Sequence, residues 1–153
     1  MHQHDEFLRE AIAESKKSVD AGGFPVGCVI VEDGKIVARG VSNGKQLVDP
    51  TSHAETDAIR ALCKSRRTRF LKNCTLYSSC EPCLMCLASS VWARIPRIVF
   101  ACERKNIPSN YFESNLSIES FLETVKHPLQ VEFVSKIEAK ALEVINEFEG
   151  QVV

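Results

Sequence analysis

The sequence predicts a single α/β domain in three layers, α/β/α, around a central five-stranded mixed sheet. Strand-like and helical segments alternate along the chain, the first two strands are joined by the tight turn Asp33-Gly34, and 153 residues suit one ordinary domain. Strands separated by helices favour parallel pairing, because each crossover helix must cover a face of the sheet, whereas a two-residue turn makes an antiparallel hairpin. We therefore expect one domain over residues 1–153, with a mostly parallel sheet whose opening hairpin is antiparallel.

The first elements are an amphipathic helix and a hairpin. Apolar residues recur at helical spacing over residues 7–19, and the pattern stops before Gly22-Gly23. Two runs rich in β-branched residues, 26–31 and 35–39, flank Asp33-Gly34, a dipeptide that suits the positive φ angles of a tight turn. These signals predict a helix followed by two paired strands.

The rest of the chain continues to alternate between helix and strand. Pro82 is favoured as a first helical residue, because its missing N–H would have no partner there. The predicted elements are a polar loop at 40–51, a helix with the apolar stripe Ala54, Ala58, Ala61 and Leu62, strands at 75–77, 97–101 and 131–134, helices from Pro82 and at 117–125, and a final helix over 137–148. The predicted order is α-ββ-α-β-α-β-α-β-α.

Composition excludes several classes of protein. Nineteen basic and 20 acidic side chains give a net charge of -1, so no global field draws the chain to nucleic acid or to an anionic membrane. No apolar run approaches the length of a membrane span, and the first residues lack the pattern of a secretory signal. Seven cysteines are an odd number, which suits reduced thiols. We expect a cytoplasmic protein with no membrane partner.

Two segments carry the candidate chemistry, and each stands at a predicted helix start. They are His53-Ala54-Glu55 and Pro82-Cys83-Leu84-Met85-Cys86. Cys83 and Cys86 are three residues apart, which places both sulfurs on one face of a helix, where they can bind one ion. A helix amino terminus also favours the thiolate that binds metal. We interpret His53, Cys83 and Cys86 as ligands of one Zn²⁺ ion.

Three protein ligands leave one position of a zinc tetrahedron open. Structural zinc sites are usually closed by four protein ligands, whereas catalytic sites keep a place for water, whose pKa falls from about 15.7 towards roughly 7. A nucleophile made in this way needs a proton carrier, and Glu55 stands two residues beyond His53. The pattern therefore predicts a hydrolytic enzyme with Glu55 as its catalytic acid and base.

Each of these residues has a simpler interpretation when it is taken alone. Ser52-His53-Ala54-Glu55 matches a capping box, in which the glutamate binds an amide at the start of the helix. Cys83 and Cys86 could be a redox pair or packed core thiols. Cys80 is close enough in sequence to compete as a ligand, but it precedes the predicted helix, so we leave it out of the ligand set. The joint pattern is harder to obtain by chance, and it favours the metal site.

The two motifs together resemble the zinc-dependent cytidine and nucleobase deaminase superfamily, whose signature is His-x-Glu followed by Pro-Cys-x-x-Cys. The resemblance covers most of the chain, because the segments 24–31 and 49–51 also look like the family. The segment 79–86 with Trp92-Ala93-Arg94 looks most like bacterial guanine deaminases. The resemblance implies a five-stranded sheet flanked by helices and a homodimer or larger assembly.

The same resemblance assigns roles to individual residues. It implies zinc held by His53, Cys83 and Cys86, and a reaction in which a ring amino group is replaced by a carbonyl with release of ammonia. Glu55 would carry the protons, and the backbone N–H of Ala54 would bind a substrate carbonyl.

The interpretation favoured here is a small-molecule nucleobase or nucleoside substrate, with guanine ahead of cytosine. In similar enzymes an asparagine two residues after the glycine that closes the hairpin binds the base, but here Gly40 is followed by Val41-Ser42-Asn43. Either Asn43 or Ser42 is therefore expected to contact the substrate. Tyr111-Phe112-Glu113-Ser114 stands where guanine deaminases carry an aromatic and acidic segment that could close over a purine, and a packed surface loop is an equal alternative.

Two other functions remain open. Pro25-Val26 and the segment 131–148 look more like cytosine deaminases and tRNA adenosine deaminases, and the basic run 64–72 could contact the phosphates of a tRNA. The acidic segment 143–149, and the lack of a glycine-rich loop at 104–108, argue against tRNA. The third hypothesis is a non-catalytic protein that uses zinc for structure alone.

Overall fold

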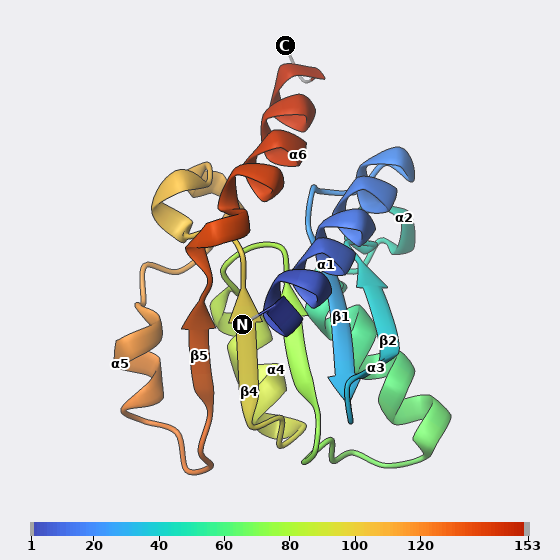
Figure 1. Cartoon of the computed structure of the whole chain (residues 1–153), viewed down its shortest axis with the longest axis vertical. Helices are drawn as coiled ribbons and strands as arrows, with labels where there is room; N and C mark the ends of the chain where they lie inside the picture. The colour runs from blue at the N-terminus through green and yellow to red at the C-terminus, as the bar shows by residue number, and fades with distance from the viewer. Residues whose placement is uncertain (1, 152–153) are drawn as a thin grey trace.

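The computed structural model describes residues 2–151 and contains one five-stranded sheet with helices packed on its two faces (Figure 1). The helices are α1 (His2–Asp20), α2 (Gly44–Leu47), α3 (Ala54–Arg66), α4 (Leu84–Trp92), α5 (Ile118–Leu122) and α6 (Glu138–Gln151). The strands are β1 (Gly27–Glu32), β2 (Lys35–Val41), β3 (Thr75–Ser78), β4 (Arg97–Phe100) and β5 (Gln130–Phe133). The predicted alternation is confirmed, and the predicted loop 40–51 contains the additional short helix α2.

The strands lie in the order β2-β1-β3-β4-β5, with β1 antiparallel to both of its neighbours and β3, β4 and β5 parallel to one another. The sheet is mixed and five-stranded as predicted. The expected hairpin is the antiparallel part of the sheet, and four of the five strands, all but β1, run in the same direction. The crossover through α3 makes β3 parallel to β2, and β1 lies between them, so β1 also pairs antiparallel with β3.

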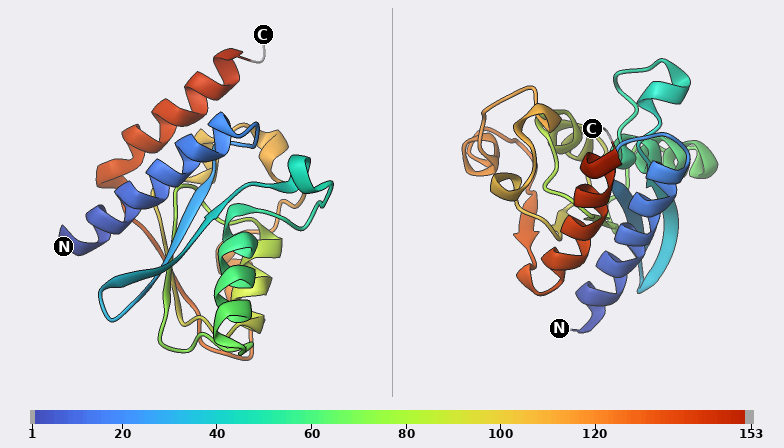
Figure 2. Two further views of the ribbon diagram at one scale, coloured as in Figure 1. Left: turned by 90° about the vertical axis from the view of Figure 1, so that its right-hand side faces the viewer. Right: turned by 90° about the horizontal axis from the view of Figure 1, so that it is seen from above.

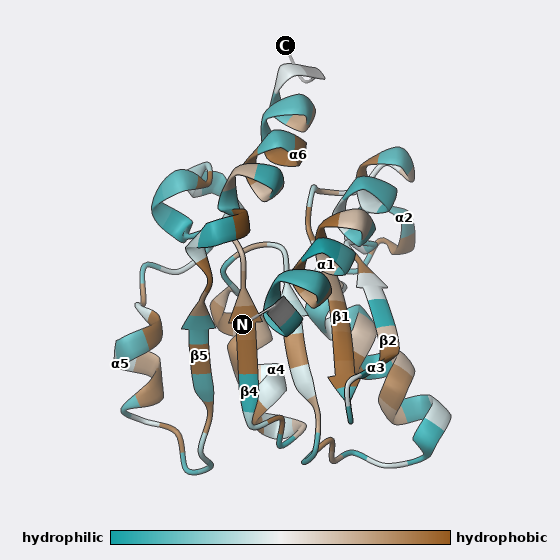
Figure 3. Cartoon of the chain, in the orientation of Figure 1, coloured by the Kyte–Doolittle hydropathy of each residue, from teal (hydrophilic) through white to brown (hydrophobic). Residues whose placement is uncertain are grey.

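Helices α1 and α6 cover one face of the sheet, and α3 and α4 cover the other, which gives the predicted three layers (Figure 2). Successive strand residues point to opposite faces. Val29 and Val99 accordingly lie in the core beneath α1 and α6, whereas Ile30 and Ile98 lie in the core beneath α3 and α4, and all four are fully buried. Because β1 and β4 are buried on both faces, they are apolar along most of their length (Figure 3).

The ends of the first elements follow the predicted turn chemistry. Asp33 and Gly34 have φ angles of 50° and 72°, the positive pair that the hairpin turn requires. Helix α1 ends at Asp20, ahead of Gly22 with its φ of 91°. It begins earlier than its apolar pattern, at His2, and His4 Nδ1 lies 2.8 Å from the hydroxyl oxygen of Tyr77.

Helix α4 begins at Leu84, two residues later than the prediction from Pro82. Cys83 is the N-cap residue and has extended backbone angles, φ −73° and ψ 170°. Proline fixes φ at about −65°, a value shared by helices and by extended backbone, so Pro82 does not by itself determine the first helical residue.

The carboxyl ends of β3 and β4 meet the amino ends of α3 and α4 at one edge of the sheet. In open α/β sheets, ligands bind outside the carboxyl ends of the strands. This edge is therefore where a functional site is expected. Within residues 2–151, none of the helices combines the length and the apolar character needed to cross a membrane.

Candidate active site

His53, Cys83 and Cys86 come together at this edge of the sheet. Nδ1 of His53 lies 3.4 Å from Sγ of Cys83 and 3.6 Å from Sγ of Cys86, and the two sulfur atoms are 3.7 Å apart. Over residues 2–151, this is the one group of three or more His, Cys, Asp or Glu side chains close enough to hold a metal ion.

The three separations fit a zinc ion. Tetrahedral zinc, with Zn–S bonds of about 2.3 Å and a Zn–N bond of about 2.05 Å, requires sulfur atoms about 3.8 Å apart and a nitrogen about 3.6 Å from each sulfur. The observed distances of 3.7, 3.4 and 3.6 Å agree closely with these values. Two thiolates and an imidazole are also the donor set that zinc favours. Within the described chain no fourth side chain joins the group, so a bound ion would keep an open position.

The starts of two helices place these three candidate ligands. His53 is the N-cap residue of α3, Cys83 is the N-cap residue of α4, and Cys86 is the third residue of α4. The backbone N–H of His53 donates a hydrogen bond of 2.9 Å to Oγ1 of Thr56, so Thr56 supplies the side chain that caps α3. The capping-box interpretation of Glu55 is therefore wrong, and its carboxylate is free for another role.

The two thiols differ in acidity. The hydrogen bond between the two sulfur atoms, together with the nearby His53 ring, lowers the pKa of Cys83 to about 4. The same hydrogen bond, with burial, raises the pKa of Cys86 well above the usual thiol range. Zinc ligands are bound as thiolates, so binding must displace the proton from Cys86 and becomes weaker at low pH.

Glu55 points from α3 into the interior, beside the ligand group. One carboxylate oxygen, Oε1, accepts a hydrogen bond of 2.7 Å from the hydroxyl of Ser78, and Oε2 lies 3.2 Å from Sγ of Cys86. The residue is 3% exposed. Burial and the negative charge of Cys83 raise the pKa of Glu55, and the Ser78 hydrogen bond opposes them. A carboxylate with a raised pKa next to a metal site is suited to proton transfer near neutral pH.

Two of the candidate ligands, His53 and Cys83, and the carboxylate residue Glu55 line a cavity with a volume of about 570 Å³. Its walls come from four parts of the chain: the loop after α1, the segment from the end of β2 to the start of α3, the segment from the end of β3 to the start of α4, and the segment 107–114. The lining residues are Phe24, Val26, Ser42, Pro50, His53, Ala54, Glu55, Cys80, Glu81, Cys83, Leu84, Met85, Ile107, Asn110, Tyr111, Phe112, Glu113 and Ser114.

Of the two substrate contacts predicted after the hairpin, Ser42 and Asn43, only Ser42 lines the cavity. Asn43 instead precedes α2 as its N-cap residue. Ala54 lines the cavity as the first residue of α3. Cys80 also reaches the cavity wall, but it is outside the three-residue metal group.

Sequence reasoning missed two residues that shape the site. Ser78 follows the predicted strand 75–77, and nothing in its pattern shows that its hydroxyl holds Glu55. Phe24 lines the cavity although it is 47% exposed. Its exposure is a property of the folded chain, so no pattern in the sequence distinguishes Phe24 from a core residue.

Comparison with known proteins places the chain in a family. Residues 1–102 match the cytidine and deoxycytidylate deaminase zinc-binding region. Guanine deaminase of Bacillus subtilis is 42% identical over 113 residues, which are 73% of this chain and 72% of that protein. The tRNA-specific adenosine deaminase of Aquifex aeolicus is 34% identical over 93% of this chain and 91% of its own. A probable cytosine deaminase of Schizosaccharomyces pombe is 36% identical over 82% and 80% of the two chains.

Solved structures agree with these relatives. A structure from a study of tRNA:A34 deaminases covers 92% of this chain and 99% of its own, at 28% identity and a TM-score of 0.79. A structure of guanine deaminase from Bacillus subtilis covers 96% and 94% of the two chains, at 34% identity and a TM-score of 0.65. With its zinc-binding region, its cytidine-deaminase-like fold and these relatives, the chain belongs to the cytidine and deoxycytidylate deaminase family of zinc-dependent hydrolases that cleave a C–N bond.

Proposed function

We propose that this protein hydrolyses the amino group from a free nucleobase or nucleoside, with guanine as the favoured substrate and cytosine as the next. The observation that carries this proposal is the segment 107–114, whose aromatic and acidic side chains line the same cavity as His53 and Glu55. Its volume, about 570 Å³, falls within the range of roughly 300–1,000 Å³ that is usual for small-molecule sites. In the overall reaction, the base and one water give ammonia and a base with a carbonyl in place of the amine.

His53, Cys83 and Cys86 are the residues that would hold the zinc ion. When bound, zinc supplies a Lewis acid and a water of lowered pKa next to the substrate carbon. The protein contributes the fixed positions of the three ligands, because each stands within the first turn or at the cap of a helix.

Glu55 is the group that holds and moves the proton. Its Oε1 is fixed by Ser78, so Oε2 is the oxygen that faces the ligand group and can exchange a proton there. Oε2 takes a proton from the attacking water and passes it to the neighbouring ring nitrogen. It then takes the proton of the added hydroxyl, as the carbonyl forms, and delivers it to the departing amine, which leaves as ammonia. The buried position keeps bulk water from competing for that proton.

Two groups on the cavity wall are assigned to binding the base. Ala54 is the first residue of α3, so its backbone N–H has no acceptor within the helix and can donate to a substrate carbonyl. Ser42, the residue after β2, offers its hydroxyl. We assign the substrate contact to Ser42 rather than to Asn43, because Asn43 does not line the cavity.

Glu113 is the feature that favours guanine. In guanine, the carbon that carries the amine has a ring N–H, N1–H, on one side. In cytosine and adenine, the carbon that carries the amine lies between an unprotonated ring nitrogen and a ring carbon, so these bases have no N–H next to that carbon. A second carboxylate in the cavity can accept the N1–H of guanine, in a hydrogen bond strengthened by its charge.

A tRNA-specific adenosine deaminase is the alternative, supported by the Aquifex relative that covers 93% of this chain. The predicted phosphate contacts lie away from the cavity, however. The basic run 64–72 begins in the last turn of α3. The 13 residues of this helix span about 20 Å from its amino end, where His53 stands. Arg66 is paired with Glu32, and Arg69 and Lys72 lie over the ring of Phe70.

Ammonia release from the zinc-loaded protein tests the two functions together. The substrates are guanine, cytosine, adenine, their nucleosides and a tRNA with a wobble adenosine, and Glu55→Ala is the blank. Release from guanine or cytosine supports the proposal. Release from the tRNA alone contradicts it, and replacing Lys64, Arg69 and Lys72 with glutamine would then abolish that activity while leaving any turnover of free bases unchanged.

The proposal also covers the domain organisation, the location and the assembly of the protein. We infer one deaminase domain over residues 1–153, because all five strands share one sheet. We also infer a cytoplasmic homodimer. A second copy would cover the exposed apolar side of α4, where Trp92 is 81% exposed and Leu84 is 37% exposed. Light scattering during gel filtration measures the mass, and a monomer at micromolar concentration would contradict the dimer.

A further inference from the structure

One buried hydroxyl on α1 joins two walls of the cavity. Ser18 is 1% exposed, and its Oγ donates a hydrogen bond of 2.6 Å to the carbonyl oxygen of Phe24. The same Oγ accepts a hydrogen bond of 3.1 Å from the backbone N–H of Ser42. Phe24 and Ser42 both line the cavity, although one follows α1 and the other follows β2, whereas Ser18 does not reach it. One side chain outside the cavity therefore connects two segments that form it.

The two segments are in backbone contact at this point. A Cβ atom at Gly23 would lie 2.1 Å from the carbonyl oxygen of Ser42 and 2.9 Å from Oγ of Ser18. The backbone N–H of Gly23 also donates a hydrogen bond of 2.8 Å to the carbonyl oxygen of Ser18. Because the contact has no spare room, the position of the Ser18 hydroxyl is transmitted to both walls.

The side chain of Phe24 packs against two aromatic residues, Tyr111 of the segment 107–114 and Phe148 of α6, which we call the aromatic cover of the cavity. The Phe24 ring packs edge-on against Tyr111 at a centroid distance of 5.4 Å, and it packs against Phe148 of α6 in a tilted arrangement at 5.7 Å. The hydroxyl of Tyr111 donates a hydrogen bond of 2.6 Å to Glu149. A shift of the Phe24 backbone therefore moves a ring on which the cover of the cavity packs.

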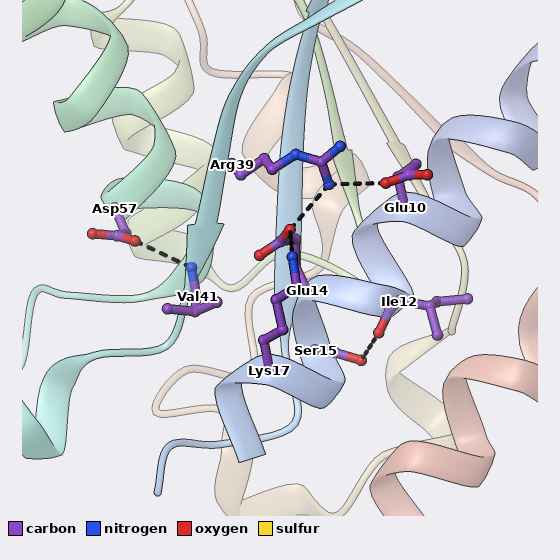
Figure 4. A network of polar contacts seen from close by, with 8 residues as sticks. All are labelled: Glu10, Ile12, Glu14, Ser15, Lys17, Arg39, Val41 and Asp57. Carbon is purple, nitrogen blue, oxygen red and sulfur yellow. Dashed lines mark hydrogen bonds and ion pairs between the residues drawn. The ribbon is translucent and has the colours of Figure 1, made fainter. Parts of the chain in front are cut away.

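Two contacts before Ser42 fix the position of β2, but neither fixes the backbone after the strand ends. Arg39 pairs with Glu14 of α1 at 3.0 Å, and the backbone N–H of Val41 donates a hydrogen bond of 3.1 Å to Asp57 of α3 (Figure 4). After Val41 the chain leaves the sheet. The next backbone N–H is the one bound by the Ser18 hydroxyl, so this contact determines where the cavity wall begins.

We propose that Ser18 is a positioning residue that sets the spacing between Phe24 and Ser42, and through it the affinity of the cavity for the base. This inference rests on the proposed function, because it concerns specificity at the same site. Ser18→Ala removes the acceptor of the Ser42 N–H, whereas the Phe24 carbonyl still accepts the N–H of Val26 at 2.8 Å. Glu55 and the three zinc ligands are not touched by Ser18, so the chemical step is unaffected.

Ser15 provides a matched control one turn earlier on α1. It is also 1% exposed, but its hydroxyl donates its hydrogen bond, at 2.6 Å, to Ile12 of its own helix (Figure 4). Ser15→Ala therefore removes an equally buried hydroxyl from the same helix without changing a bond to the cavity wall. A general effect of hydroxyl loss on the fold would be common to both variants.

The first experiment compares steady-state kinetics of the two variants on whichever base the zinc-loaded wild type deaminates best. For Ser18→Ala we expect KM to rise about tenfold, equivalent to about 1.4 kcal/mol of binding free energy, with kcat within about twofold of wild type. Ser15→Ala should leave both constants unchanged. An unchanged KM in Ser18→Ala, or a loss confined to kcat, would overturn the proposal.

Amide hydrogen exchange at Ser42 gives a readout that needs no substrate. In Ser18→Ala the Ser42 amide should exchange at least about tenfold faster than in wild type, because it has lost its acceptor, and in Ser15→Ala it should not. Equal exchange in both variants overturns the positioning role. If the wild type releases no ammonia from any free base, the proposed function fails, and the exchange comparison still decides the role of Ser18.

Discussion

The hydroxyl of Ser78, at the end of β3, donates a 2.7 Å hydrogen bond to Oε1 of Glu55 on α3. This bond joins the sheet to the helix that carries the proposed proton carrier. It lowers the pKa of Glu55 against the stronger effect of burial, and it directs the other carboxylate oxygen toward Cys86.

Ser78→Ala should shift the pH dependence of the reaction. Glu55 accepts a proton only when it is ionised, so activity is lost as the pH falls through its pKa. Removing a hydrogen bond that lowers this pKa raises it, and the acid limb of kcat/KM should move upward by about one pH unit, with a fall in kcat of about tenfold. Ser79→Ala, which removes the neighbouring hydroxyl, is the control. An acid limb at the wild-type pH in Ser78→Ala would show that this bond does not tune Glu55.

The metal group should depend on three residues and not on the nearby Cys80. Cys83→Ser and Cys86→Ser each remove one thiolate, so zinc measured by elemental analysis should fall from one ion per chain to a small fraction, and activity should be lost with it. Cys80→Ala should retain both zinc and turnover. Zinc loss in Cys80→Ala with zinc kept in Cys83→Ser would mean that the ligand set is wrong.

The affinity of the site for zinc, measured against a chelator and corrected for the chelator's own protonation, should fall as the pH falls. The pKa of Cys86 is raised by its hydrogen bond to Cys83 and by burial, so a proton competes with zinc for this sulfur over a wide pH range. Titration of the chelator at several pH values measures this competition. A zinc affinity independent of pH between 5 and 8 would contradict the proton exchange inferred from the pair.

Glu113→Gln should separate guanine from cytosine. The substitution keeps the size of the side chain but removes the charge that strengthens the hydrogen bond to N1–H of guanine. A charge-assisted hydrogen bond contributes about 1.5–3 kcal/mol, so kcat/KM for guanine should fall by roughly 10- to 100-fold. Turnover of cytosine, which offers no such N–H, should change little. Equal losses for the two bases would mean that Glu113 does not select the purine.

Gly40 should be required for the packing of β2 against α3. A Cβ atom there would lie 2.1 Å from the carbonyl oxygen of Ala54 and 2.9 Å from Cβ of Ala58. Gly40→Ala should therefore lower the free energy of unfolding by about 3 kcal/mol and displace the helix that carries Glu55. Gly150→Ala has no atom within 4 Å of the added carbon and should be neutral or slightly stabilising in the same denaturant titration.

The predictions that succeeded from sequence rest on local patterns. Cys83 and Cys86 are three residues apart, so any helix start at that point brings their sulfurs to one face. The five strands are short β-branched runs bounded by turns, and Asp33-Gly34 suited only a tight hairpin turn. Two local patterns each permitted two outcomes. Pro82 was predicted to begin a helix that begins two residues later, and Glu55 matched a capping box in which Thr56 is the residue that accepts the hydrogen bond of the His53 N–H.

The amino-acid sequence by itself determined the family, the metal ligands that we propose and the element order, because each is encoded by residue types at short spacing. The tertiary structure alone decided that Ser42 and not Asn43 faces the cavity, that Ser78 holds Glu55, and that Ser18 connects Phe24 with Ser42. Those contacts join segments that are distant in the sequence. Their geometry depends on how β2 packs between α1 and α3, and no periodicity within a single segment specifies that packing.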